Sequence, residues 1–174
     1  SDAVDRVVGG IERKKTIMSP EEKRLTAFHE AGHAVAGWLL PGCDPVLKVS
    51  IIPRGQALGI TWMLPDEKVT RSKSEILDDM CSLVAGRVAE EKVNNGVPCT
   101  GALSDFERMT KMAYAMVSYY GMSEKVGNLS FYDTQGGYEF TKPYSEKTAE
   151  LIDSEVKALI DNVTERTRKI LLDN

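Results

Sequence analysis

The residues best placed to do chemistry are His29 and His33, which stand four residues apart with Glu30 beside the first. They are the only two histidines in a sequence of 174 residues. Residues i and i+4 of an α-helix project from one face, one turn apart, so both imidazoles can bind the same metal ion. The pattern H-E-x-x-H is typical of zinc hydrolases.

A catalytic zinc ion takes three protein ligands and leaves a fourth position for water. His29 and His33 supply two of these ligands. Glu30 points away from the shared direction of the imidazoles but can still reach the metal-bound water. We therefore expect Glu30 to act as general base, taking a proton from the water that attacks a carbonyl and passing it to the leaving amine.

The spacing of the motif leaves the third ligand open. A third histidine, as in the metzincin extension, is absent from the sequence. The remaining candidates are Asp105, in the first turn of a predicted helix, the neighbouring pair Glu90 and Glu91, and Cys99. Each also has an ordinary structural interpretation: stabilisation of a helix dipole for Asp105, a solvated helix surface for the glutamates, and a small buried side chain for Cys99.

The segment that carries the motif predicts a long helix. Ser19 is placed as the N-cap, Pro20 as the first helical residue and Glu22 as the third, which combines a capping box with the favoured position of proline. The helix is expected to run from about Pro20 to Leu40 and to end at the following Pro-Gly pair.

The apolar residues of this helix are expected to seat it in the core, and Gly32 to leave room beside the metal. These apolar residues are Phe28, Ala31, Val35 and Leu39. Both tryptophans, Trp38 and Trp62, are likewise predicted to be core residues.

The other segments predict more helices and one small sheet. The expected elements are a short helix over Ala3–Lys15, strands over Val46–Ile52 and Ala57–Leu64, and helices from Ser72 to about Val93, from Ser104 to Tyr120 and from Ser145 to Leu172. The predicted fold class is mainly α with a small β-sheet (α+β).

The composition is that of an ordinary globular domain, with 42% hydrophobic and 28% charged residues. A net charge of −4 without a basic block argues against a nucleic-acid partner. The longest apolar stretch, Ala34–Leu40, is far shorter than the ~20 residues of a spanning helix, so no transmembrane segment is predicted. Three cysteines without a C-x-x-C pair favour a reducing compartment.

Several blocks of the sequence, in order, resemble the C-terminal peptidase domain of FtsH-type membrane-anchored AAA+ metalloproteases, including their mitochondrial relatives. Together they are far more specific than the metal motif alone. The blocks are His29–Ala34, Leu40–Val46, Lys48–Gly55, Ala57–Gly59, Ala85–Glu91, Thr100–Ala102, Ser104–Arg108 and Tyr120–Lys125.

The resemblance implies an ATP-dependent zinc endopeptidase of protein quality control. It would hydrolyse unfolded or membrane-extracted proteins by Glu30-assisted attack of zinc-bound water, and would assemble into a hexamer with a proteolytic chamber. In the family the aspartate of the block around Asp105 is the third ligand, which selects it over Glu90, Glu91 and Cys99. The implied zinc ligands are therefore His29, His33 and Asp105.

The resemblance also implies a substrate-binding strand. Its residues correspond to the edge strand along which family members lay the substrate backbone, a form of β-augmentation. These residues are Gly59, Ile60, Thr61, Trp62 and Met63.

Residues 1–16 are expected to be the tail of an upstream ATPase domain or a linker, and residues 17–174 the zinc metalloprotease domain. The sequence holds no G-x-x-x-x-G-K-[ST] phosphate loop, so ATP and Mg²⁺ are expected to bind only in an ATPase domain upstream of Ser1. The membrane anchor is expected there too. The full-length protein would then act at the cytoplasmic side of the inner (plasma) membrane, whereas this fragment would be soluble.

Two other functions are compatible with the motif. One is a catalytically inactive oligomerisation module of the same family, which need not bind zinc at stoichiometry. The other is a stand-alone zinc hydrolase such as an amidase, which would act on small substrates as a monomer. Zinc content tests the first alternative, and molecular size together with a peptide assay tests the second.

Overall fold

The computed structural model describes residues 2–13, 17–133 and 142–174. In these ranges the chain is mostly helical with one two-stranded sheet, which confirms the predicted fold class. The helices are α1 (Asp2–Gly9), α2 (Pro20–Leu39), α3 (Lys73–Val93), α4 (Leu103–Ser118) and α5 (Glu146–Asp173), with a short 3₁₀ helix η1 (Thr100–Ala102), and the strands are β1 (Val46–Ser50) and β2 (Ile60–Met63).

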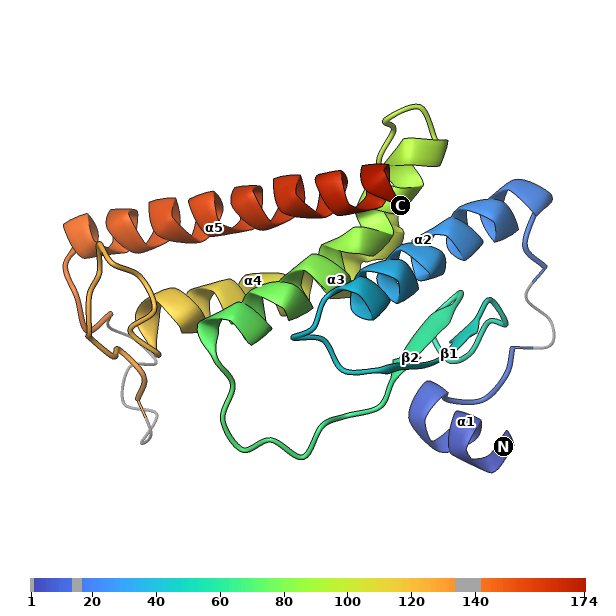
Figure 1. Ribbon diagram of the computed structural model, residues 1–174, viewed down its shortest axis with the longest axis horizontal. Helices are drawn as coiled ribbons and strands as arrows, with labels where there is room; N and C mark the ends of the chain where they lie inside the picture. Colours follow the sequence, from blue (N-terminus) through green and yellow to red (C-terminus); the bar gives the residue numbers. More distant parts are fainter. Residues whose placement is uncertain (1, 14–16, 134–141) are drawn as a thin grey trace.

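Helix α3 is the centre of the helical part of the fold. It contacts α2, α4 and α5, and in Figure 1 α5 runs along α3 and α4 while α2 lies at the other side of α3. None of the described helices is both long and apolar enough to cross a membrane. The largest fully buried side chains are Met80, Met109, Met116, Ile152, Val84, Thr167 and Cys81.

The two longest helices before the loop to α4 begin where local capping predicts. Ser19 and Glu22 form a complete capping box at α2, with Pro20 in the first turn. Ser72 and Glu75 form the same reciprocal pair at α3. Each box satisfies backbone N–H groups that have no partner within the helix, which confirms both predicted starts.

Strands β1 and β2 form an antiparallel hairpin between α2 and α1 (Figure 1). One face contacts α2. On the other face, Lys48 of β1 pairs with Asp5 of α1 at 2.5 Å. Strand β2 is shorter than the predicted range 57–64, because Arg54 and Ala57 exchange backbone hydrogen bonds of 2.9 Å with each other in a tight turn before the strand.

The predicted inward face of α2 is wrong. Phe28, Val35 and Leu39 are 41%, 37% and 42% exposed, Ala31 is exposed as well, and Trp38 is 81% exposed instead of lying in the core. The buried face consists of His29, Glu30, Gly32, His33, Ala36 and Gly37. Small residues on this face let α3 approach closely, so the bulkier apolar side chains lie on the outer side of the helix.

Gly32 is central to this approach. The sequence predicts that it leaves room beside the metal, but in the structure it faces the backbone of α3. A β-carbon at residue 32 would lie 2.4 Å from the carbonyl oxygen of Ala85 and 2.7 Å from the β-carbon of Ala89, both on α3. Glycine at this position therefore allows contact between the two helix backbones, which sets the depth of His29 and His33 in the fold.

Candidate metal centre

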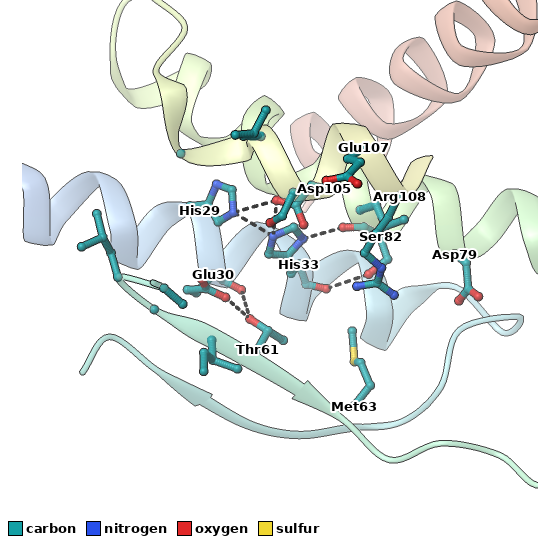
Figure 2. Close-up of a pocket in the computed structure, with 18 of the residues that line it drawn as sticks. His29, Glu30, His33, Thr61, Met63, Asp79, Ser82, Asp105, Glu107 and Arg108 are labelled. Carbon is teal, nitrogen blue, oxygen red and sulfur yellow. Dashed lines mark hydrogen bonds and ion pairs between the residues drawn. The ribbon is translucent and has the colours of Figure 1, made fainter. Parts of the chain in front are cut away.

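The imidazoles of His29 and His33 meet on the buried face of α2. Both residues are buried, at 8% and 9% exposure, and their Nε2 atoms lie 2.9 Å apart. The spacing of four residues places one ring a turn beyond the other, as the sequence predicts. Figure 2 shows the two rings directed toward the same point, below the start of α4.

Asp105 is the carboxylate that the fold brings to this point. Its Oδ2 lies 3.1 Å from Nε2 of His29 and 3.4 Å from Nε2 of His33. The donor atoms of the three residues all lie within 4.8 Å of one another, a spacing that allows one metal ion to bind all three. The three residues predicted as metal ligands are therefore adjacent, although they come from distant parts of the sequence.

Arg87 of α3 contacts the segment that carries Asp105. Its guanidinium lies 4.7 Å from the ring centroid of Phe106 and donates a hydrogen bond of 2.6 Å to the carbonyl of Cys99. These contacts tie the loop before α4, and the first turn of α4, to α3. Asp105 lies in that first turn, where the helix dipole also favours a carboxylate.

The other three candidate ligands have different partners. Glu90 contacts His29 at Nδ1, on the far side of the ring, with a separation of 2.6 Å. Glu91 pairs with Arg168 of α5 at 3.5 Å, and the sulfur of Cys99 lies 3.6 Å from the side-chain nitrogen of Asn94. None of these groups reaches the point where the two Nε2 atoms converge.

The hydrogen bonds at Nδ1 determine which ring nitrogens can act as ligands. Nδ1 of His33 lies 2.6 Å from the carbonyl oxygen of Ser82 and must donate to it, because a carbonyl only accepts. Nδ1 of His29 likewise donates to the Glu90 carboxylate. In the neutral rings both Nε2 atoms then carry lone pairs, directed at each other and at Asp105.

Two lone pairs and a carboxylate oxygen repel one another unless a positive charge lies between them. In the metal-free protein a proton on His29 provides this charge. Burial by itself lowers the pKa of His29, but the Asp105 and Glu90 carboxylates raise it to about 9. Burial raises the pKa of Asp105, yet the two imidazoles hold it well below its usual range. Two imidazole nitrogens and one carboxylate are also the donor set of catalytic zinc sites, so the residues present suit that metal.

Gly86 keeps the space beside the two Nε2 atoms open. A β-carbon at this position of α3 would lie 2.6 Å from Cε1 of His29 and 2.7 Å from Nε2 of each histidine. Sequence reasoning assigned no role to Gly86. The signal was a glycine inside a long helix, where it costs ~1 kcal/mol relative to alanine and is usually retained for packing or function.

Glu30 lies at the side of the site that faces the hairpin. It is 6% exposed, and its Oε2 accepts a hydrogen bond of 2.6 Å from the hydroxyl of Thr61 in β2. Figure 2 shows this pair between α2 and β2, next to the imidazoles.

A cleft of about 730 Å³ connects the imidazoles, Glu30 and Asp105 to β2. Four of the five predicted substrate-binding residues line it: Gly59, Ile60, Thr61 and Met63. Trp62 does not line the cleft, and its ring lies near Gly9 of α1. The site can therefore hold an extended chain along β2 beside a metal ion and a carboxylate base.

Comparison with known proteins identifies relatives over nearly the whole chain. A family model described as peptidase family M41 matches residues 16–174. ATP-dependent zinc metalloprotease FtsH of Parabacteroides distasonis is 49% identical over 174 residues, which are 99% of this chain and 25% of the relative. The protein of the same name from Rhodothermus marinus is 53% identical, with 97% of this chain and 25% of the relative covered.

A mitochondrial protein is similar to the same degree. The mitochondrial inner membrane m-AAA protease component AFG3L2 of Mus musculus is 49% identical over 170 residues, with 97% of this chain and 21% of the relative covered. The chain thus spans about a quarter or less of the length of these relatives.

Proposed function

Because the chain belongs to peptidase family M41, as an FtsH-type peptidase domain, we propose that it is the zinc metalloendopeptidase part of an ATP-dependent AAA+ protease. The observation that carries the proposal is the convergence of two Nε2 atoms and one carboxylate oxygen beside Glu30 and an open strand edge. The names of the relatives agree with the donor set, since they are zinc metalloproteases.

Zinc would be held by Nε2 of His29, Nε2 of His33 and Oδ2 of Asp105. When bound, it lowers the pKa of water and polarises a peptide carbonyl. Glu90 and the carbonyl of Ser82 orient the two imidazoles through their Nδ1 protons. This outer layer fixes the tautomer of each ring and keeps Nε2 directed at the metal position.

Glu30 would be the general base. Its carboxylate takes the proton of the attacking water and delivers it to the nitrogen of the leaving amine, so the peptide bond breaks without a covalent intermediate. Burial next to the imidazoles and the hydrogen bond from Thr61 support this role, because they keep the carboxylate at the edge of the cleft.

The substrate would be an unfolded polypeptide bound along β2. Among the described residues the sheet has two strands, so the edge of β2 that does not pair with β1 can add an extended chain through main-chain hydrogen bonds. Along Gly59, Ile60, Thr61, Trp62 and Met63, the backbone N–H and C=O groups of alternate residues would face that edge, and Trp62 belongs to this stretch although its side chain lies on the other face. Binding through the main chain is tolerant of sequence, which suits a protease of protein quality control.

The remaining properties belong to the whole protein. We propose that residues 1–16 are the tail of an upstream ATPase domain, which would bind ATP and Mg²⁺, and that residues 17–174 form the protease domain. The complete protein would be a membrane-anchored homohexamer acting at the cytoplasmic side of the inner membrane. The acidic net charge gives no reason to add a nucleic-acid partner.

The proposal is tested by zinc analysis and by the Glu30→Gln variant of the complete protein. We expect about one zinc ion per chain in both proteins, and a loss of at least about 100-fold in the cleavage rate of an unfolded substrate in the variant. Full activity in Glu30→Gln would remove the general base. A wild-type protein without bound zinc and without cleavage would favour the inactive oligomerisation module.

A further inference from the structure

Thr61 is the one described residue whose side chain hydrogen-bonds to the Glu30 carboxylate. Its hydroxyl oxygen lies 2.6 Å from Oε2 and 3.0 Å from the backbone carbonyl of Glu30. A hydroxyl has one proton to donate, and a charged acceptor at the shorter distance receives the stronger bond. The carboxylate is therefore the main acceptor.

Resting on the proposed function, we propose that Thr61 is a positioning residue for the general base. By occupying Oε2, the hydroxyl leaves Oε1 as the oxygen that exchanges the reaction proton. In the described part of the chain nothing else hydrogen-bonds to the Glu30 side chain. Glutamate has three side-chain torsions, so without this bond the carboxylate could turn away from the attacking water.

The packing of β2 against α2 makes the contact possible. A β-carbon at residue 59 would lie 2.9 Å from Cγ of Glu30 and 2.9 Å from Cγ2 of Thr26. Glycine at this position lets the strand approach the helix until the Thr61 hydroxyl reaches the carboxylate.

The same residue also joins substrate binding to catalysis. Thr61 lies opposite Val49 of β1, its side chain points to α2, and the residue lines the cleft at the free edge of β2. A substrate strand bound to that edge would be aligned by the residue that aligns the base. Replacing only the side chain should therefore affect proton transfer and leave main-chain binding intact.

The test compares Thr61→Val and Thr61→Ser in the complete, zinc-loaded protein with a quenched-fluorescent unstructured peptide. Valine has nearly the shape of threonine without the donor, so kcat should fall about 10- to 100-fold, as expected for one hydrogen bond to a charged group. KM and zinc content should stay at wild-type values. Thr61→Ser should restore kcat, because serine keeps the hydroxyl.

Three further measurements separate positioning from a structural role. Thr164→Val removes a partly buried hydroxyl of α5 whose one hydrogen bond to a described residue is to the carbonyl of Ile160 in the same helix, so it should not change kcat. Thr61→Val added to Glu30→Gln should cause no further loss. A crystal structure of zinc-loaded Thr61→Val should show the Glu30 carboxylate displaced.

The outcomes that overturn the inference differ from those that overturn the proposed function. Unchanged kcat in Thr61→Val, equal loss in Thr61→Ser, or loss of zinc in Thr61→Val would refute positioning through Glu30. Persistent cleavage by Glu30→Gln would refute the proposed function whatever Thr61 does.

Discussion

In each imidazole of the site, a hydrogen bond at Nδ1 fixes the direction of Nε2 in the same ring. Nδ1 of His29 is held by Glu90 and Nδ1 of His33 by the carbonyl of Ser82, both at 2.6 Å. The second bond is made by backbone and is insensitive to substitution of residue 82. The bond at His29 depends on the side chain of Glu90. A substitution of Glu90 can therefore test how this bond affects the affinity for zinc, without changing a zinc ligand.

Glu90→Gln should weaken zinc binding about 10- to 100-fold, the usual effect of removing an outer-layer partner. The amide still reaches Nδ1 but loses the negative charge that makes the imidazole a stronger donor to the metal. Competition with a chromophoric chelator measures the affinity. The neighbouring variant Glu91→Gln is the matched control, since Glu91 pairs with Arg168, and it should bind zinc like wild type. Equal affinities in all three proteins would contradict the role of Glu90.

The pKa of His29 makes the stability of the metal-free protein depend on pH. Burial alone would lower the pKa of His29, but the carboxylates of Asp105 and Glu90 raise it from 6.5 to about 9. A pKa raised by folding means that protonation stabilises the folded chain. The contribution is complete below about pH 6.5 and is lost as the pH rises through 9. Urea unfolding of chelator-treated protein should show a decreasing free energy of unfolding over this interval.

His29→Gln provides the comparison, since it lacks the titrating imidazole. Its free energy of unfolding should change little over the same interval. Zinc affinity of the wild-type protein should change in the opposite direction and increase with pH, because the metal must displace the proton. A decrease in stability as steep in His29→Gln as in wild type would assign the pH dependence to another group.

At the scale of the elements, the close approach of α2 and α3 decides where the site lies. A β-carbon at residue 32 would lie 2.4 Å from a backbone oxygen of α3, which a change of side-chain rotamer cannot relieve. Gly32→Ala should therefore separate the helices and lower the free energy of unfolding by about 1–3 kcal/mol, in spite of the better helix propensity of alanine. Urea denaturation measures the change.

Ala31→Leu is the matched control on the exposed side of the same helix. It adds more volume than Gly32→Ala but should change the free energy of unfolding by no more than about 0.5 kcal/mol. Similar effects of the two substitutions would show that the helix interface is not the sensitive feature.

The starts of α2 and α3 were predictable from the sequence because capping is local, whereas α1 ends at Gly9 and not at the predicted Lys15. Ser19 and Glu22, three residues apart, determine the start of α2 without reference to the rest of the fold. The buried face of α2 was not predictable in the same way. It consists of histidines, a glutamate and small residues, whereas Phe28, Val35 and Leu39 are partly exposed, so the apolar pattern indicated the wrong side.

Asp105, the third predicted zinc ligand, was also not predictable from local sequence alone, because its position depends on tertiary packing. H-E-x-x-H places His29 and His33 together because one turn of helix joins them. Asp105 reaches them only through the packing of α2 and α4 on α3 and the anchoring of the preceding loop by Arg87. Spacing in the sequence contains neither relation, and family resemblance was needed to favour Asp105 over Glu90, Glu91 and Cys99.

At the scale of the whole molecule, the donors come from two helices that each pack on α3. Zinc bound to His29 and His33 of α2 and to Asp105 of α4 would link the first half of the chain to the second. An ion that binds the folded chain and not the unfolded one stabilises the fold by mass action. Stability of the complete fold should therefore depend on the concentration of free zinc.

Removal of zinc should lower the thermal midpoint of the protease domain. At a free zinc concentration about 100 times Kd, binding contributes about 2.7 kcal/mol, which corresponds to roughly 5–10 °C for a domain of this size. Scanning calorimetry with and without a chelator measures the shift, and readdition of zinc should reverse it. Mg²⁺ should not replace zinc, because it prefers oxygen ligands and two of the three donors are nitrogens. Asp105→Asn is the decisive variant: it keeps the shape of the site, so a zinc-dependent shift as large as that of wild type would exclude Asp105 as the group that ties α4 to α2.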